Sequence, residues 1–266
     1  MTEDLIVTPG SPAALSERDP ASTLGLADKD AGKARRDELR HRLRDLHSRL
    51  WAAEERAVVV VLQGMDTSGK DGAVKKVFRR LDPQGFRVIG FKAPAGEELF
   101  HDYLWRVHAV CPRLGTIAVF NRSHYEDVVA ARVRKVLEAD WGRRFQHIRE
   151  FERMLTDERT AIVKVFLHIS RDEQRTRLQA RLDRPDKRWK FRLGDLDDRA
   201  RWDDFEAAYE EAIAETSTPW APWHVVPADH KWVRDVAVAQ IMVEALERLD
   251  PQYPEPDEGL DDVESP

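Results

Sequence analysis

Residues 57–63 read AVVVVLQ, a run of β-branched and apolar residues with no polar alternation. A strand of this kind is typical of a parallel sheet in which both faces are buried under helices. The run is followed at once by GMDTSGKDG, residues 64–72, and then by the helical pattern AVKKVFRRL. A buried strand, a glycine-rich loop and a helix in this order are the setting of a phosphate-binding loop. We therefore expect a central parallel strand with an anion site at its carboxyl end.

The alternation of strand and helix continues along the chain. Further strands are expected at 86–92, 115–120, 161–170 and 223–228. The helical patterns that separate them cover 29–54, 99–110, 143–159, 171–182, 194–217 and 233–249. Strands that alternate with helices make right-handed crossovers and a parallel sheet covered on both faces. We predict an α/β fold, a three-layer α/β/α sandwich with a parallel five-stranded sheet.

The two ends of the chain depart from this pattern. Residues 1–28 contain three prolines among small and polar residues and are expected to form an extended N-terminal arm. Residues 29–250 are expected to form a single domain. Residues 251–266 are rich in proline and acidic residues and carry no basic residue, so we expect a disordered, solvated tail.

Charge and cysteine content narrow the class of protein. The formal net charge is −6, which argues against a surface that binds nucleic acid in general, so any anion site must be local. The single cysteine, Cys111, excludes an internal disulfide and is typical of a reducing compartment. The chain lacks the run of about 18 apolar residues that a membrane span needs, and its first residues do not resemble a secretory signal. We expect a soluble cytoplasmic protein that binds neither nucleic acid nor membrane.

The loop after the first strand fits the Walker A pattern G-x-x-x-x-G-K-[ST] except at its last position, where Asp71 replaces the hydroxyl residue. That hydroxyl normally holds Mg²⁺, so a carboxylate in the loop, Asp66 or Asp71, could take over its role. Lys75, one turn into the helix, either reaches the same phosphates or is a solvated lysine. The candidate phosphate-binding residues of this segment are Gly64, Thr67, Ser68, Gly69, Lys70, Asp71, Gly72 and Lys75.

A second group of candidates follows the third strand, in FNRSHYEDV at 120–128. Ligands of α/β sheets lie beyond the carboxyl ends of the strands, so this segment should face the same site. Asn121 can coordinate or donate a hydrogen bond, and Arg122 can bind phosphate with its planar fork. Glu126 and Asp127 either take part in the chemistry or simply favour the start of a helix.

A third group is strongly basic. Residues 171–192 hold nine lysines or arginines against four acidic residues. Such a run is either a solvated surface or a site for a polyanion, and its place after a strand end in an acidic protein favours the polyanion. Trp189 lies within it and could anchor a mobile lid.

Five stretches in order resemble the polyphosphate kinase 2 family. They are GMDTSGKDG, FKAP at 91–94, PRLGTIAVFNRSHYEDV at 112–128, RPDKRWKFRLGDLDDRARWDDF at 184–205 and APWHVVPADHKWVRD at 221–235. The resemblance covers about residues 35–250. It implies a P-loop kinase-like fold with a helical lid, at about 171–200, and Mg²⁺-dependent phosphoryl transfer between inorganic polyphosphate and nucleotides, with Mn²⁺ as a substitute ion.

The resemblance also implies roles for single residues. Asp66 corresponds to the family's metal-binding loop acid and Lys70 to its loop lysine. Asn121 and Arg122 correspond to its Walker B-type pair, and Glu126 and Asp127 follow as further catalytic candidates. The basic residues expected to hold polyphosphate are Arg177, Arg181, Lys187 and Lys190.

The nucleotide that accepts the phosphoryl group is indicated by one difference from part of the family. Members that prefer nucleoside diphosphates tend to have Trp-Tyr-Asn where this chain has His124-Tyr125-Glu126. The chain therefore resembles members that phosphorylate AMP, ADP or both, and guanine nucleotides are further candidates. We expect direct in-line transfer without a phospho-enzyme and a homo-oligomer, either dimer or tetramer. The alternatives are an ATP-dependent nucleotide kinase of the P-loop class and a non-catalytic protein that binds polyanions or nucleic acid.

Overall fold

Strand β1 (Ala57–Gln63) lies at the centre of the sheet, and all seven of its residues are buried. The computed structural model describes residues 2–257. Strands β3 (Ile117–Asn121) and β4 (Thr160–His168) pair with β1 on either side, and β2 (Phe86–Gly90) and β5 (Trp223–Pro227) form the edges. Every pairing is parallel. The prediction of a parallel five-stranded sheet is confirmed.

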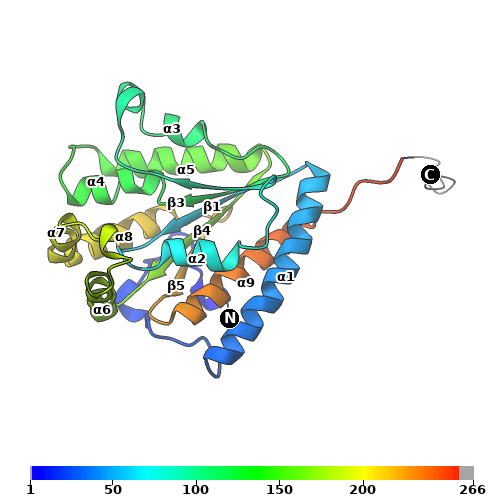
Figure 1. Ribbon diagram of the computed structural model, residues 1–266. Coiled ribbons are helices and arrows are strands. Elements are labelled where there is room, and N and C mark those ends of the chain that lie inside the picture. The colour runs from blue at the N-terminus through cyan, green and yellow to red at the C-terminus, as the bar shows by residue number, and fades with distance from the viewer. Residues whose placement is uncertain (1, 258–266) are drawn as a thin grey trace.

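Helices cover both faces of this sheet (Figure 1). Val58, Val60 and Leu62 of β1 face one core with α1 (Lys29–Ala53), α2 (Lys70–Val77) and α9 (Lys231–Leu249). Val59 and Val61 face the other core with α5 (Trp141–Asp157) and α8 (Trp202–Thr216). Because successive side chains of a strand point to opposite faces, the unbroken apolar run serves two cores at once. The predicted three-layer sandwich is confirmed.

Two expected helices were wrong in detail. In place of one helix over 99–110, the chain forms a 3₁₀ turn at Gly96–Phe100 and a short α3 (Trp105–His108). No residue of the turn is buried, and Phe100 is 87% exposed, so no packed face holds a longer helix here. The helix expected over 194–217 is divided at Arg201 into α7 (Gly194–Ala200) and α8, because only α8 packs into the core.

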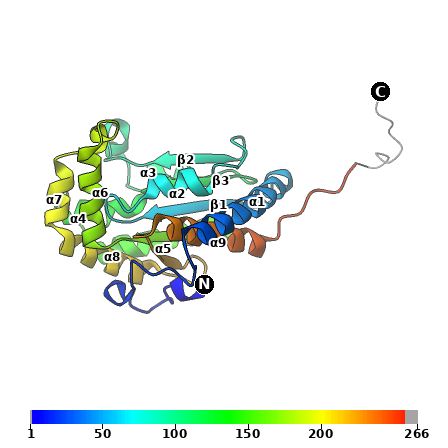
Figure 2. The same cartoon turned by 60° about the horizontal axis from the view of Figure 1, so that its bottom comes forward.

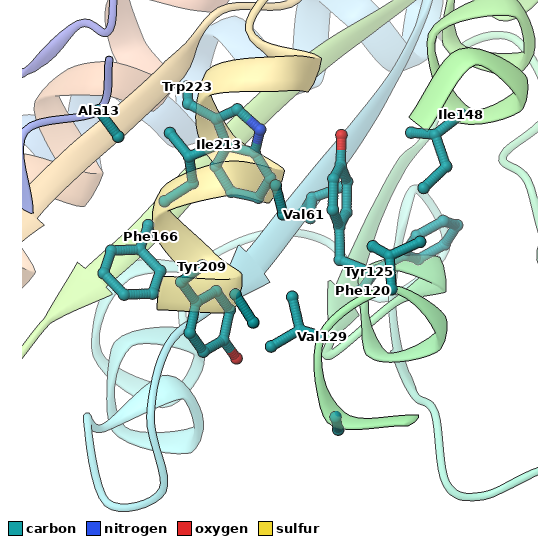
Figure 3. Packing of buried hydrophobic residues seen from close by; sticks show 14 of the residues in the cluster. Ala13, Val61, Phe120, Tyr125, Val129, Ile148, Phe166, Tyr209, Ile213 and Trp223 are labelled. Atoms are coloured by element: carbon teal, nitrogen blue, oxygen red, sulfur yellow. The ribbon is translucent and has the colours of Figure 1, made fainter. Parts of the chain in front are cut away.

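The N-terminal segment is packed against the domain. Within residues 2–28 the side chains of Leu5, Val7, Ala13 and Leu15 are buried. Ala13 points into the same core as Trp223 and Phe166 (Figure 3). At the other end, residues 251–257 contain no helix or strand, and the rest of the predicted acidic tail, residues 258–266, lies outside the described residues.

The carboxyl ends of the strands meet at one edge of the sheet, where α6 and α7 stand (Figures 1 and 2). The remaining elements are the helices α4 (Ala130–Val133) and α6 (Arg171–Asp183), with 3₁₀ turns at Glu3–Leu5, Leu15–Glu17, His124–Asp127 and Arg188–Lys190. Across residues 2–257, none of the helices has the length and apolar character needed to span a bilayer.

Candidate active site

The glycine-rich loop connects β1 directly to α2, as its sequence predicts. Its backbone enters the left-handed region at Gly64 (φ 146°), Thr67 (φ 66°) and Gly69 (φ 104°), and α2 begins at Lys70. Thr67 is the only one of the three with a side chain, so the loop holds it in a costly conformation. The hydroxyls of Thr67 and Ser68 are buried and have no hydrogen-bond partner among the described residues. Of these two residues, only Thr67 lines the cleft that opens above the loop.

A cleft of about 1010 Å³ opens above this loop. Most of the candidates from the sequence line it. These are Asp66, Thr67, Gly69, Lys70, Asp71, Gly72, Asn121, Arg122, Arg177, Arg181, Lys187 and Lys190. The candidates from three distant parts of the sequence thus come together at the carboxyl edge of the sheet.

Two candidates, Lys75 and Asp127, lie elsewhere, and Ser68 is buried within the loop and does not line the cleft. Lys75 is exposed on α2 and does not line the cleft, as expected of a solvated lysine. Asp127 is buried in an ion pair with Arg106 at 3.2 Å, away from the cleft lining. Burial raises the pKa of Asp127 against the opposing effect of Arg106.

Lys70 is buried at the floor of the site. Its ammonium donates to the carbonyl oxygens of Gly64 at 2.6 Å and Met65 at 3.2 Å, which folds it back over the loop. Burial lowers the pKa of Lys70 to about 8, and the nearby Arg122 adds to this effect. A bound phosphate would oppose both causes, because a negative charge favours the ammonium form.

Asp66 and Arg122 form an ion pair across the floor of the cleft, with 2.8 Å between Oδ1 and Nη2. Burial opposes ionisation of Asp66, but the charges of Lys70 and Arg122 outweigh it and the pKa lies below its ordinary value. Arg122 adopts a left-handed backbone (φ 65°), and its N–H donates to Leu62 O at 3.1 Å. The end of β3 is therefore turned sharply toward the loop.

Glu126 lies next to these charges, 3.9 Å from Arg122, and lines a small cavity that adjoins the cleft. Burial raises the pKa of Glu126, although Arg122 and Lys70 act in the opposite direction. Gly64, the remaining loop candidate besides Ser68, lines the same small cavity.

The two residues before Glu126 face the protein interior. The Tyr125 hydroxyl donates to Glu152 at 2.7 Å, and the His124 ring lies 3.4 Å from the same carboxylate. Lys164 on β4 donates to Glu152 at 2.5 Å and, like its partner, is completely buried. Burial opposes the ionisation of Glu152, but Lys164 outweighs it and lowers the pKa of that carboxylate. Figure 3 shows Tyr125 beside Trp223, where their rings meet edge to face. This internal network anchors the turn that carries Glu126.

Asp71 reaches across to other elements. Its carboxylate accepts from Asn121 at 2.7 Å and from Lys190 at 3.3 Å. Lys190 belongs to the basic segment, so this contact joins that segment to the loop. A second contact between elements is the ion pair of Arg134 with Asp198 of α7, and both of these residues line the cleft.

Several residues at the site were not predicted, among them Arg134, Tyr209, Gln63 and Arg234. Arg134 lines the cleft, and the Tyr209 hydroxyl lies 3.3 Å from Gly64 O. Gln63 lies between Tyr209 and the turn before Glu126 and bonds to Ser123. Arg234 lies beneath the loop, where a Cβ atom on Gly69 would collide with its guanidinium. The only signal for Gln63 was a polar residue at the end of an apolar strand.

The chain is similar to a known protein family and to several of its members. Residues 26–254 match the family model described as polyphosphate kinase 2. The chain is 54% identical over 226 residues to the AMP/ADP-polyphosphate phosphotransferase of Meiothermus ruber, covering 85% of each protein. It is 43% identical over 227 residues to the ADP-polyphosphate phosphotransferase of Rhodopseudomonas palustris, covering 80% of this chain and 78% of that protein. The crystal structure of polyphosphate kinase 2 from Arthrobacter aurescens TC1 superposes with a TM-score of 0.93 at 44% identity, over 98% of this chain and 93% of that one.

Proposed function

Because the chain belongs to the polyphosphate kinase 2 family, we propose that it transfers phosphoryl groups between inorganic polyphosphate and the nucleotides AMP and ADP. One observation carries the proposal: a phosphate loop, the Asp66–Arg122 pair and the basic segment share one cleft. The many positive side chains that line this cleft suit it to bind polyanions. The names of the relatives from Meiothermus ruber and Rhodopseudomonas palustris support this choice of substrates.

The proposed reaction is direct in-line transfer. Phosphoryl transfer depends on alignment of the reactants and on neutralisation of charge, and it asks for little covalent chemistry from the protein. The loop amides and Lys70 hold the phosphate next to the reacting one. Arg122 stabilises the charge that develops on the transferred group. The lysines and arginines of the lid hold the rest of the polyphosphate chain.

Glu126 is proposed to distinguish acceptors by their number of phosphates. Of the three residues His124, Tyr125 and Glu126, the first two are engaged in the internal network and only Glu126 lies beside Lys70 and Arg122. A carboxylate at this point repels an additional phosphate and tolerates the shorter AMP.

The donor set fits Mg²⁺. Asp66 and Asp71 line the same cleft, and the pKa of each carboxyl lies below its ordinary value. Burial is outweighed at Asp66 by the charges of Lys70 and Arg122, and at Asp71 by hydrogen bonds from Asn121 and Lys190. Within residues 2–257 there is no cluster of three or more His, Cys, Asp or Glu side chains that could hold a metal alone. One or two carboxylates completed by substrate phosphates are the usual setting of Mg²⁺, which neutralises phosphate charge when bound. We propose Asp66 as the protein ligand, with Asp71 as the alternative.

Substitution of the two aspartates one at a time tests this choice. Asp66→Asn is expected to remove most of the Mg²⁺-dependent activity and to raise the Mg²⁺ concentration needed for half-maximal rate. Asp71→Asn is the matched control, and it is expected to weaken only the contacts with Asn121 and Lys190. Initial rates over a Mg²⁺ series measure both. Loss of the Mg²⁺ response in Asp71→Asn alone would move the assignment to Asp71.

The lowered pKa of Lys70 predicts a pH dependence. Since the pKa of the Lys70 ammonium is about 8 when no substrate is bound, this group loses its charge as pH rises through that value. We expect kcat/KM for polyphosphate to fall above about pH 8. The fall in kcat should occur at higher pH, because bound phosphate raises the pKa of the ammonium. Lys70→Arg, whose guanidinium stays charged, should remove this alkaline decline. A decline that persists in Lys70→Arg would assign it to another group.

A substrate panel tests the function as a whole. Purified protein is given AMP, ADP, GMP or GDP with Mg²⁺ and either polyphosphate or ATP, and the products are separated by chromatography. Formation of ADP and ATP from polyphosphate supports the proposal. Turnover with ATP alone would point to an ATP-dependent nucleotide kinase, and salt-sensitive nucleic-acid binding without turnover to a binding protein.

A further inference from the structure

Arg177 projects from α6 to the phosphate loop, and its side chain is only 7% exposed. Its Nη1 donates to the carbonyl oxygens of Thr67 and Ser68, both at 3.0 Å. Its Nε donates to Glu173, one turn earlier on the same helix, at 2.7 Å. Arg177 therefore contacts the backbone of the loop itself.

The other terminal nitrogen of the Arg177 guanidinium, Nη2, contacts the segment that follows β5. Nη2 donates to Ala228 O at 2.6 Å and to Asp229 O at 2.8 Å, directly after β5. Asp229 is fixed in turn, because its carboxylate accepts from the Ser170 N–H at 2.8 Å. Arg177 thus ties the loop after β1 to the connections after β4 and β5.

These contacts leave Arg177 no donor for a substrate. A guanidinium has five N–H groups, and five protein acceptors engage them. Although Arg177 lines the cleft, binding of phosphate would break a bond to a buried carbonyl. Arg181, one turn further along α6, differs, since its ion pair with Asp195 is long, at 3.7 Å.

The bond to the Ser68 carbonyl also determines where the next amide points. In a trans peptide the C=O and the following N–H point in opposite directions. With Ser68 O held by Arg177, the Gly69 N–H points away from Arg177, and it has no acceptor among residues 2–257. That amide precedes the first turn of α2, where backbone N–H groups bind anions.

A second arginine supports the same face of the loop. A Cβ atom on Gly69 would meet Arg234 first and Arg177 next, and one on Gly72 would also meet Arg234. Arg234 is 3% exposed and paired with Asp235. Two buried guanidiniums therefore lie along one side of the loop.

We propose that Arg177 is a positioning residue, which fixes the peptide planes of the phosphate loop so that its amides can bind phosphate, and that it does not itself bind polyphosphate. The inference deepens the proposed function and rests on it for its kinetic consequences. The bracing of the loop can be measured without any substrate.

The test compares Arg177→Lys with Arg181→Lys. Both variants keep the charge, but an ammonium cannot reach four carbonyl oxygens as the planar fork does. Hydrogen exchange of the 64–72 segment is measured by mass spectrometry in the absence of substrates. We expect faster exchange in Arg177→Lys and no change in Arg181→Lys. Unchanged exchange in Arg177→Lys would overturn the inference whatever reaction the protein catalyses.

Kinetics supply the second readout. In Arg177→Lys, kcat should fall about 10²-fold while KM for polyphosphate stays close to that of the wild type, because misplaced loop amides impair alignment more than affinity. A rise in KM with kcat unchanged would make Arg177 a polyphosphate ligand and overturn the inference. If Arg177→Lys does not fold, Glu173→Gln, which weakens only the Nε contact, should give a smaller increase in the same exchange, and no increase there would count against bracing. Wild-type protein that fails to use polyphosphate would overturn the proposed function, but the exchange comparison would still decide the role of Arg177.

Discussion

Arg122→Ala is expected to lower the rate of phosphoryl transfer by about 10³-fold or more, the usual loss when an arginine that stabilises the transferring phosphoryl group is removed. Arg122 lines the cleft at the end of β3, beside Lys70 and within 2.8 Å of Asp66. In the proposed reaction its charge would lie where negative charge builds up in the transition state, so the loss should fall mainly on kcat. Steady-state kinetics with polyphosphate and ADP measure it.

A matched control separates this effect from the loss of any arginine. Arg153 is exposed on α5 and pairs with Asp157 one turn away, outside the cleft lining. Arg153→Ala should leave kcat unchanged. Wild-type turnover in Arg122→Ala would contradict the role of Arg122.

The second large effect concerns stability. Lys164→Met is expected to lower the free energy of unfolding by about 3–5 kcal/mol, because it leaves Glu152 charged and without its partner in the core. Both side chains of this pair are at most 1% exposed, so water cannot replace the lost ammonium. Chemical denaturation monitored by fluorescence or circular dichroism measures the change.

Two further variants sharpen this prediction. Adding Glu152→Gln to Lys164→Met should recover part of the loss, since the uncompensated charge is gone. Arg153→Met, which breaks an exposed pair, should cost less than about 1 kcal/mol. A loss in Lys164→Met as small as that of Arg153→Met would show that the core tolerates Glu152 alone.

The sequence predicted those features of the site that depend on chain order. A buried apolar run followed by glycines and a lysine marks a strand end, and the carboxyl ends of parallel strands lie together. Asp66, Lys70 and Arg122 were found in this way. The helix expected over 99–110 failed because its first apolar residues, Leu99 and Phe100, are exposed and have no core to pack on, which is a property of the tertiary structure.

Other features depend on contacts that no local pattern contains. Arg177 and Arg181 have the same chemistry in the sequence, yet Arg177 is buried among backbone carbonyls and Arg181 is not. Likewise Asp127 looks like a neighbour of Glu126, but it turns inward to Arg106. Burial and partner decide the role of a charged residue, and both arise from segments far away in the chain.

The N-terminal segment has a consequence for handling the protein. Ile6 forms an antiparallel bridge with His224, and Val7 N–H donates to Trp223 O at 2.8 Å, so the segment occupies the outer edge of β5. A truncated protein that begins at α1 would lose Ile6 and Val7 from this edge. Backbone groups of β5 that these residues now contact would then be exposed. Open edges of this kind pair with other chains and promote aggregation. We therefore expect the first residues to protect this edge of the sheet from association with other copies of the chain.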